Sequence, residues 1–292
     1  MIFSLFNSLI DVDLPINKYF DCSAFDNNSK TEIKIQQKKI EFKNLDVVKN
    51  KPYSINLTST YGEIYKKNIG RFILREGVII EYEACKRAKM PNLIAYIFTH
   101  VIGFLLYQRN HLVMHASAIE LNGKSILFCG RSGFGKSYLV KNFLPKANFI
   151  AEDICCISKE HKIALPSLPF IKVENGPTTY KEKRFYSTEN DKRNRIIVPI
   201  EQTNKFNNTQ IKACFFLKFS KKSGVEPIHK IEAFKNIISN SFFSDPILKE
   251  DQINHTRKIS SFLEGVHSYN LLRADKENFD FNEIESCLAE IR

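Results

Sequence analysis

Residues 126–140, ILFCGRSGFGKSYLV, place a glycine-rich turn between an apolar run and a sequence with helical character. Within this stretch, residues 130–137 fit the pattern G-x-x-x-x-G-K-[ST] at every fixed position. Glycines let backbone N–H groups converge where side chains would block the approach, and the following helix adds the positive end of its dipole. The pattern predicts a strand, a phosphate-binding loop of the Walker A type and a helix. The alternative is an ordinary glycine turn that caps a helix.

If the loop is of the Walker A type, it holds the phosphates of a nucleoside triphosphate. Lys136 is then expected to reach the β- and γ-phosphates, and the Ser137 hydroxyl to ligate Mg²⁺. Guanine specificity is not expected, because the nearest string to N-K-x-D, residues 204–207, lacks the aspartate. The residues predicted to bind ATP are Gly130, Arg131, Ser132, Gly133, Phe134, Gly135, Lys136, Ser137 and Tyr138.

Composition bounds the class of protein. With 292 residues, 43% hydrophobic and 26% charged, the chain is long enough for one large domain or two modest ones. A formal net charge of +11 favours anionic partners such as nucleotides or acidic peptides, and a nucleic-acid partner is not expected. The seven cysteines are odd in number and never spaced C-x-x-C, which is typical of a reducing cytosol. We therefore expect a cytoplasmic protein. Composition does not determine the oligomeric state, and a homo-oligomer is one of the states that it allows.

Two segments resemble membrane-directed sequence without matching it. The N-terminal MIFSLFNSLIDVDLP is apolar but has no basic leader, and Asp11 and Asp13 follow at once, so a signal peptide is not predicted. Residues 93–107, LIAYIFTHVIGFLLY, contain Thr99 and His100 and fall short of a bilayer span. We expect a buried helix there and no membrane association.

The hydrophobic pattern of the sequence changes near residues 90–110, which predicts a domain boundary there. Residues 1–92 alternate in short β-like runs, which predicts a smaller β-rich N-terminal domain, and residues 93–292 are assigned to the nucleotide domain. In the second part, a strand, a hairpin turn at Asn122-Gly123, a second strand, the glycine turn, a helix over about 136–144 and a buried strand over 149–158 follow one another. Strand, helix and strand in that order build parallel sheets, so the predicted fold class is α/β. Further along we expect a strand at 210–219, helices at 232–243 and 247–264, a strand at 268–274 and a last helix from about Asn278.

An acidic pair, Glu152 and Asp153, ends the strand that follows the helix. At the carboxyl end of a sheet strand beside a phosphate loop, one acid suits Mg²⁺ binding and the other suits proton acceptance from an attacking hydroxyl. We assign Asp153 as the base and Glu152 as a metal ligand, with the reverse left open. The alternative is an acidic turn without chemistry.

His115 lies at a predicted strand end, fifteen residues before Gly130. The Asn122-Gly123 hairpin folds that strand back beside the one that feeds the turn. His115 is therefore a candidate to stabilise charge near the γ-phosphate or to position the acceptor. A structural role for this histidine is the open alternative.

The stretch MHASAIELNGKSILFCGRSGFGKSYLVKNFL, followed by FIAEDICCIS, resembles the catalytic domain of HPr kinase/phosphorylase. The resemblance is closer to the HPr-kinase-like proteins of modified-peptide pathways, including lasso-peptide tailoring kinases. In that group a His-x-Ser element and a hairpin precede the phosphate loop, and a doubled acid follows it by one short helix. The similarity is specific over about residues 70–160.

The resemblance implies a fold related to the nucleotide domain of phosphoenolpyruvate carboxykinase. It also implies transfer of a phosphoryl group from ATP, with Mg²⁺, to a serine hydroxyl of a peptide or protein. By position, residues 130–137 match the phosphate loop, Glu152 and Asp153 the doubled acid, and His115 the family histidine. One departure is Glu152, where the family usually has aspartate. The family's HPr-recognition segment and phosphorylase activity are not recognisable in this chain.

A polar segment, residues 180–195, is predicted to be a loop or lid whose cations stabilise charge on the γ-phosphoryl group or attract an acidic peptide. A solvated loop is the alternative. The cations are Lys181, Lys183, Arg184, Lys192, Arg193 and Arg195.

The sequence is therefore consistent with three alternative functions. The first is an ATP-dependent serine kinase for a peptide or protein, such as a ribosomal precursor peptide of the lasso type. The second is a kinase for a small alcohol such as free serine or a sugar. The third is an ATP-sensing module without transfer. A carboxykinase-like lyase fits poorly because chains with that activity are usually much longer.

Overall fold

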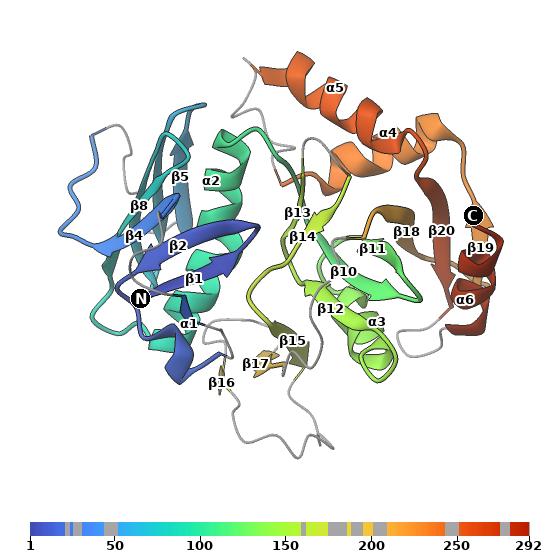
Figure 1. The fold of residues 1–292 in the computed structure, drawn as a ribbon, viewed down its shortest axis with the longest axis horizontal. Coiled ribbons are helices and arrows are strands. Elements are labelled where there is room, and N and C mark those ends of the chain that lie inside the picture. Colours follow the sequence, from blue (N-terminus) through green and yellow to red (C-terminus); the bar gives the residue numbers. More distant parts are fainter. Residues whose placement is uncertain are drawn as a thin grey trace. The chain divides into compact units, whose positions relative to one another are not determined.

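The computed structural model describes residues 1–20, 24–25, 31–43, 52–158, 162–174, 186–187, 195–200, 209–242, 251–274 and 281–291. These residues form a mixed α/β fold with several sheets and few helices (Figure 1). The chain separates into two compact units. The first comprises Met1–His111 and the described part of Pro166–Gln202, and the second comprises Leu112–Leu165 and the described parts of Thr203–Ser244 and Glu250–Arg292.

The first unit is built on a sheet with the strand order β3-β1-β2-β4-β8-β7-β6-β5. The pairs β2–β4 and β4–β8 are parallel, and the other neighbours are antiparallel. The β-rich character that the sequence predicts here is confirmed. The elements are β1 (Ile2–Leu5), β2 (Ser8–Val12), the short helix η1 (Ile16–Lys18), β3 (Ala24–Phe25), β4 (Ile33–Gln37), β5 (Tyr53–Leu57), β6 (Tyr61–Lys66), β7 (Gly70–Arg75) and β8 (Ile79–Ala84).

The apolar segment predicted to be a buried helix is helical from Met90 to Gln108. It comprises α1 (Met90–Tyr96), a π-helical turn η2 (Ile97–Val101) and α2 (Ile102–Gln108). In the π-helical turn the Thr99 hydroxyl donates to the carbonyl of Ala95 at 2.7 Å and meets His100 Nδ1 at 2.8 Å. This helix belongs to the first unit, because α2 packs on β7 and β8. The boundary predicted at 92/93 therefore differs from the division by contacts, which falls after His111.

The same helix is long and apolar enough to meet the length and hydropathy criteria for a membrane span. However, 72% of its most apolar stretch is buried inside the protein. Burial of this degree is typical of the core helix of a folded domain.

A small sheet of order β15-β17-β16 completes the described part of the first unit. Its strands are β15 (Phe170–Glu174), β16 (Tyr186–Ser187) and β17 (Arg195–Pro199). The cations predicted to act in the 180–195 segment lie outside the described residues, apart from the backbone of Arg195.

The second unit has a central sheet of order β12-β10-β11-β18-β20-β19 and a small sheet of order β14-β13-β9. The hairpin predicted at Asn122-Gly123 is confirmed: both residues have positive φ, +51° and +75°, and β10 pairs with β11 antiparallel across them. The elements are β9 (Leu112–Met114), β10 (Ala116–Leu121), β11 (Lys124–Cys129), α3 (Lys136–Phe143), β12 (Asn148–Ala151), β13 (Cys155–Ile157), β14 (Ala164–Leu165), β18 (Ile211–Phe219), β19 (Gly224–Pro227), α4 (Lys230–Asn240), α5 (Gln252–Leu263), β20 (His267–Arg273) and α6 (Phe281–Glu290).

The order of strands determines which residues meet at one edge of this sheet. Strand β10 is antiparallel to both β11 and β12, so β11 and β12 run the same way with β10 between them. Strands β18 and β20 follow β11 in parallel. The carboxyl ends of β11, β12, β18 and β20 and the amino end of β10 therefore lie at one edge. The predicted strand–helix–strand unit is present, but its two strands are not neighbours.

The buried run at 149–158, predicted as one strand, forms two. It breaks after Ala151, and the chain resumes as β13 in the small sheet, paired with β9 and β14. Asp153, with φ +68°, lies in the break. The break falls at the acid pair Glu152 and Asp153, which interrupts the apolar run but does not indicate that the chain changes sheet there.

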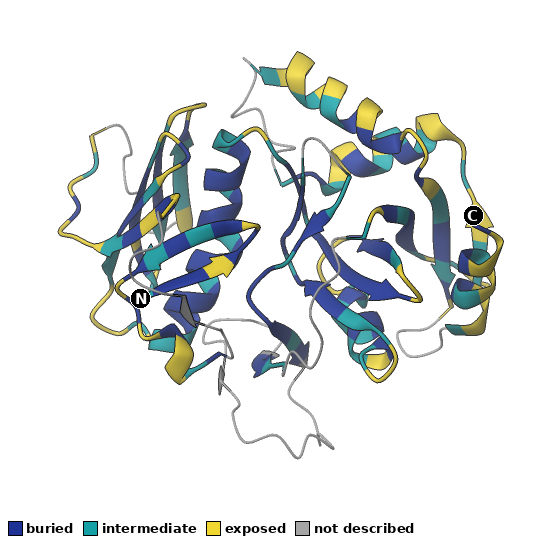
Figure 2. Cartoon of the chain, in the orientation of Figure 1, coloured by how far each residue is buried: buried dark blue, intermediate teal, exposed yellow. Residues whose placement is uncertain are grey.

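Strands β10, β11 and β18 of the central sheet are buried over most of their length (Figure 2), so the side chains on both faces of the sheet are covered. One face packs on α4 and α5 through small and sulfur-containing residues that include Cys129 and Cys214. The other face is aromatic: Phe128 stacks on Phe143 of α3, and Phe143 contacts Phe281 of α6. Burial on both faces explains why these strands are continuous apolar runs.

Candidate functional site

The glycine turn joins β11 to α3 at the carboxyl edge of the central sheet. Gly133 and Gly135 have φ values of +92° and +98°, in the left-handed region that glycine adopts without strain. Gly130 lies against Leu217 of β18, close enough that a Cβ would be 3.1 Å from the Leu217 Cβ. The helix α3 starts directly at Lys136, so its first backbone N–H groups face the turn. Strand, turn and helix are as the sequence predicts.

Arg273, the last residue of β20, contacts the glycine turn. Its side chain is only 1% exposed, and Nη1 donates to the carbonyl of Phe134. A Cβ on Gly135 would overlap this guanidinium. Gly135 is therefore constrained twice, by its backbone conformation and by the close approach of Arg273.

Replacing Gly135 with alanine is expected to lower the free energy of unfolding by more than the same change at Gly265. Both glycines have positive φ, +98° and +75°, but nothing lies within 4 Å of a Cβ at Gly265. The strained backbone costs about 1 kcal/mol at either position, and overpacking against Arg273 adds about 1–3 kcal/mol at Gly135 alone. Urea unfolding of the two variants measures the difference. If both variants lose the same free energy of unfolding, the Arg273 side chain moves to make room for the added methyl group.

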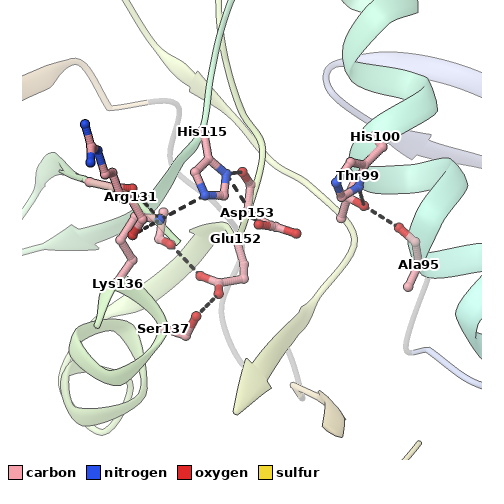
Figure 3. Close-up of polar contacts among 11 residues, drawn as sticks. Ala95, Thr99, His100, His115, Arg131, Lys136, Ser137, Glu152 and Asp153 are labelled. Atoms are coloured by element: carbon pink, nitrogen blue, oxygen red, sulfur yellow. Dashed lines mark hydrogen bonds and ion pairs between the residues drawn. The ribbon is translucent and has the colours of Figure 1, made fainter. Parts of the chain in front are cut away.

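Lys136 is buried at the start of α3. Its Nζ donates to the carbonyl of Gly130 at 2.7 Å, and it lies 3.1 Å from His115 Nε2 and 3.4 Å from the carbonyl of Arg131 (Figure 3). The ammonium group is thus held over the turn. The predicted proximity of His115 to the glycine turn is present in the structure.

Glu152 directly follows β12 and is buried beside α3. It accepts hydrogen bonds from Ser117 Oγ, at 2.5 Å, and from Ser137 Oγ (Figure 3). Burial raises the pKa of Glu152 above its usual value; the two hydroxyl bonds oppose the shift, Asp153 adds to it and Lys136 opposes it. The carboxyl group is therefore costly to ionise until a cation compensates it.

Replacing Glu152 with glutamine is expected to stabilise the ligand-free protein at alkaline pH. Because the pKa of folded Glu152 lies above 4.5, the unfolded state ionises first as the pH rises, and the wild type loses stability relative to the variant over that range. The gain should be on the order of 1 kcal/mol at pH 8 and should vanish near pH 4. Urea unfolding between pH 4 and pH 8, without nucleotide or Mg²⁺, measures it. A gap that is constant with pH would contradict the expectation.

The polar cluster beside the glycine turn comprises Lys136, Ser137, Glu152, Asp153 and His115, and the last two contact each other. The Asp153 side chain is 14% exposed, and its Oδ1 is 3.4 Å from His115 Nδ1, which also lies 2.8 Å from the Asp153 carbonyl. The His115 amide donates to the carbonyl of Asn240, at the end of α4. Asp153 is the less buried of the two acids, and His115 lies between its carboxylate and Lys136.

The structure brings most of the sequence-predicted site residues together. Two sets of contacts lie at the sheet edge, Lys136–His115–Asp153 and Ser137–Glu152, and they are joined because Lys136 precedes Ser137 and Glu152 precedes Asp153 in the chain. The Arg131 side chain is exposed and points away from the two acids (Figure 3). The remaining residues predicted to bind ATP lie in the turn or on α3: Ser132, Gly133, Phe134, Gly135 and Tyr138.

Sequence reasoning assigned no role to two residues of this site. Ser117 was noticeable only as the third residue of His115-Ala-Ser, where a spacing of two puts both side chains on one side of the strand. Arg273 lies 139 residues from Phe134 along the chain. Nothing near it in the sequence indicates that β20 ends beside the turn.

The donor set suits a hard cation. Among the residues that the structure describes, no group of three His, Cys, Asp or Glu side chains is arranged to hold a metal. Mg²⁺ at nucleotide sites needs fewer, since one or two carboxylates and a hydroxyl complement phosphates and waters. The oxygens of Ser137 and Glu152, already in contact, fit that requirement.

Neither the protein-family models nor the curated proteins compared with this chain give a match.

Proposed function

We propose that this protein is an ATP-dependent kinase that transfers the γ-phosphoryl group to a serine hydroxyl of a peptide or protein. The observation that carries the proposal is the contact of Ser137 with Glu152, which joins the start of α3 to the acid pair after β12. In nucleoside triphosphate enzymes with a phosphate loop of this pattern, the loop Ser or Thr and a carboxylate hold Mg²⁺ together.

Residues of the glycine turn would hold the triphosphate of ATP through backbone N–H groups and the amino end of α3. Ser137 and Glu152 would hold Mg²⁺, which when bound neutralises charge on the phosphoryl oxygens. The high cost of ionising Glu152 in the ligand-free protein fits a carboxylate that receives its counter-charge with the nucleotide.

In the proposed transfer, the serine oxygen bonds to the γ-phosphorus as the bond from that phosphorus to the β,γ-bridging oxygen breaks. The serine proton passes to the Asp153 carboxylate, and ADP leaves with the bridging oxygen. Lys136 stabilises the charge that spreads over the γ-phosphoryl oxygens. His115, between Lys136 and Asp153, fixes the distance between the two groups.

A peptide or protein acceptor is favoured over a small alcohol by charge and by resemblance. The net charge of +11 favours an acidic macromolecule over a neutral metabolite. The likeness of residues 70–160 to kinases of modified-peptide pathways adds a precursor peptide of the lasso type as the first acceptor to test. The proposed compartment is the cytoplasm, where ATP and ribosomal precursors are available.

The test is transfer of label from γ-labelled ATP, with Mg²⁺, to serine-containing peptides, each paired with its serine-to-alanine counterpart. Free serine and sugars are included as small acceptors. Label on the serine peptide alone supports the proposal. Label on free serine or a sugar identifies a small-molecule kinase, and tight ATP binding without any transfer identifies a sensing module.

A further inference from the structure

An exposed aromatic ring lies at the same sheet edge as the glycine turn. Phe219, the last residue of β18, is 49% exposed. Strand β18 runs parallel to β11, whose carboxyl end leads into the turn. A single exposed phenylalanine is ordinary on a protein surface, so its surroundings decide whether it is a site.

The Phe219 ring is fixed to the turn by two contacts. The Phe134 ring, from inside the turn, meets it edge to face with centroids 4.8 Å apart. The Arg273 guanidinium lies 5.7 Å from the Phe219 centroid and donates to the Phe134 carbonyl. One buried cation therefore supports both the ring and the turn. Phe134 and Phe219, with Arg273 behind them, form what we term the aromatic platform.

We propose that the aromatic platform stacks the nucleobase of the nucleotide whose phosphates occupy the glycine turn. This inference rests on the proposed function in one respect, the binding of a triphosphate by the turn. Because Phe134 is part of the turn, a base on the platform and phosphates in the turn belong to one ligand. Bases stack readily on aromatic side chains, and every base offers a π-face.

Stacking also sets the specificity expected of the platform. It discriminates between ligands that carry a base and ligands that lack one, and only weakly between bases. The platform should therefore favour ATP over inorganic tripolyphosphate, which carries the same phosphate chain without a nucleoside.

The experiment measures dissociation constants of ATP and of inorganic tripolyphosphate by calorimetry, with Mg²⁺ and without any acceptor. For Phe219→Ala we expect about a tenfold weaker affinity for ATP, about 1.4 kcal/mol, and unchanged affinity for tripolyphosphate. Phe219→Tyr keeps the ring and should bind ATP within about twofold of the wild type. Ile253→Ala on α5, where the side chain is 72% exposed, is the matched control for loss of a surface apolar group.

Two results would overturn the platform. If Phe219→Ala weakens ATP and tripolyphosphate equally, the ring only supports the turn; if it weakens neither, no base stacks there. Both readouts are independent of phosphoryl transfer. A wild type that binds ATP through the platform but labels no acceptor would refute the kinase proposal alone.

Discussion

Replacing Lys136 with alanine should lower kcat for phosphoryl transfer by about 10²–10³-fold, with a smaller change in KM for ATP. The effect follows from the position of Nζ, held over the turn by the Gly130 carbonyl and 3.1 Å from His115. A donor fixed in place before the reaction needs no reorganisation as charge develops, and removing one such donor costs about this much. Initial rates of label transfer at saturating ATP measure the loss.

Two further variants make the Lys136 prediction specific. Lys141→Ala removes a lysine one turn and a half along α3 and should keep activity near that of the wild type. Lys136→Arg retains the charge but replaces a compact ammonium by a planar fork in a buried position, so it should not restore the rate. If Lys136→Arg is fully active, net charge near the turn matters and the held geometry does not.

Local sequence was sufficient for the parts of the site that lie on consecutive elements. The Asn122-Gly123 hairpin, the glycine turn and α3 are short-range features, each specified by the backbone freedom of a few residues. The acid pair is also visible in the sequence, because Glu152 and Asp153 interrupt an apolar run at a strand end. Their roles in catalysis stay predictions.

Contacts between distant strands were not predictable in this way. Arg273 and Phe219 reach the turn because β18 lies beside β11 and β20 lies beside β18, and the order of strands in a sheet is decided by long-range packing. The predicted boundary at 92/93 differs from the division by contacts for a related reason. A helix that is apolar on most sides, Met90–Gln108, carries no mark of which sheet it will cover.

Replacing Asp153 with asparagine should lower kcat by about 10²–10⁴-fold while ATP affinity changes little. The carboxylate is the proposed acceptor of the serine proton, and loss of a positioned base costs about this much. Asparagine is the appropriate replacement because Asp153 has φ +68°, a conformation that asparagine tolerates and alanine does not. Label transfer and ATP titration measure the two quantities. Asp251→Asn, at the start of α5, is a control acid outside the site.

The Mg²⁺ dependence separates this assignment from its reverse. If Asp153 is the base and Glu152 the metal ligand, Asp153→Asn leaves the Mg²⁺ concentration for half-maximal ATP binding unchanged, whereas Glu152→Gln raises it. The contacts favour this arrangement. Glu152 accepts hydrogen bonds from Ser137 and Ser117, whereas Asp153 lies beside His115. Should Asp153→Asn instead raise the Mg²⁺ requirement while Glu152→Gln leaves it unchanged, the two acids exchange roles. Glu152 would then be a buried base with a raised pKa. The rise of the transfer rate with pH would therefore begin at a higher pH than for an ordinary carboxylate.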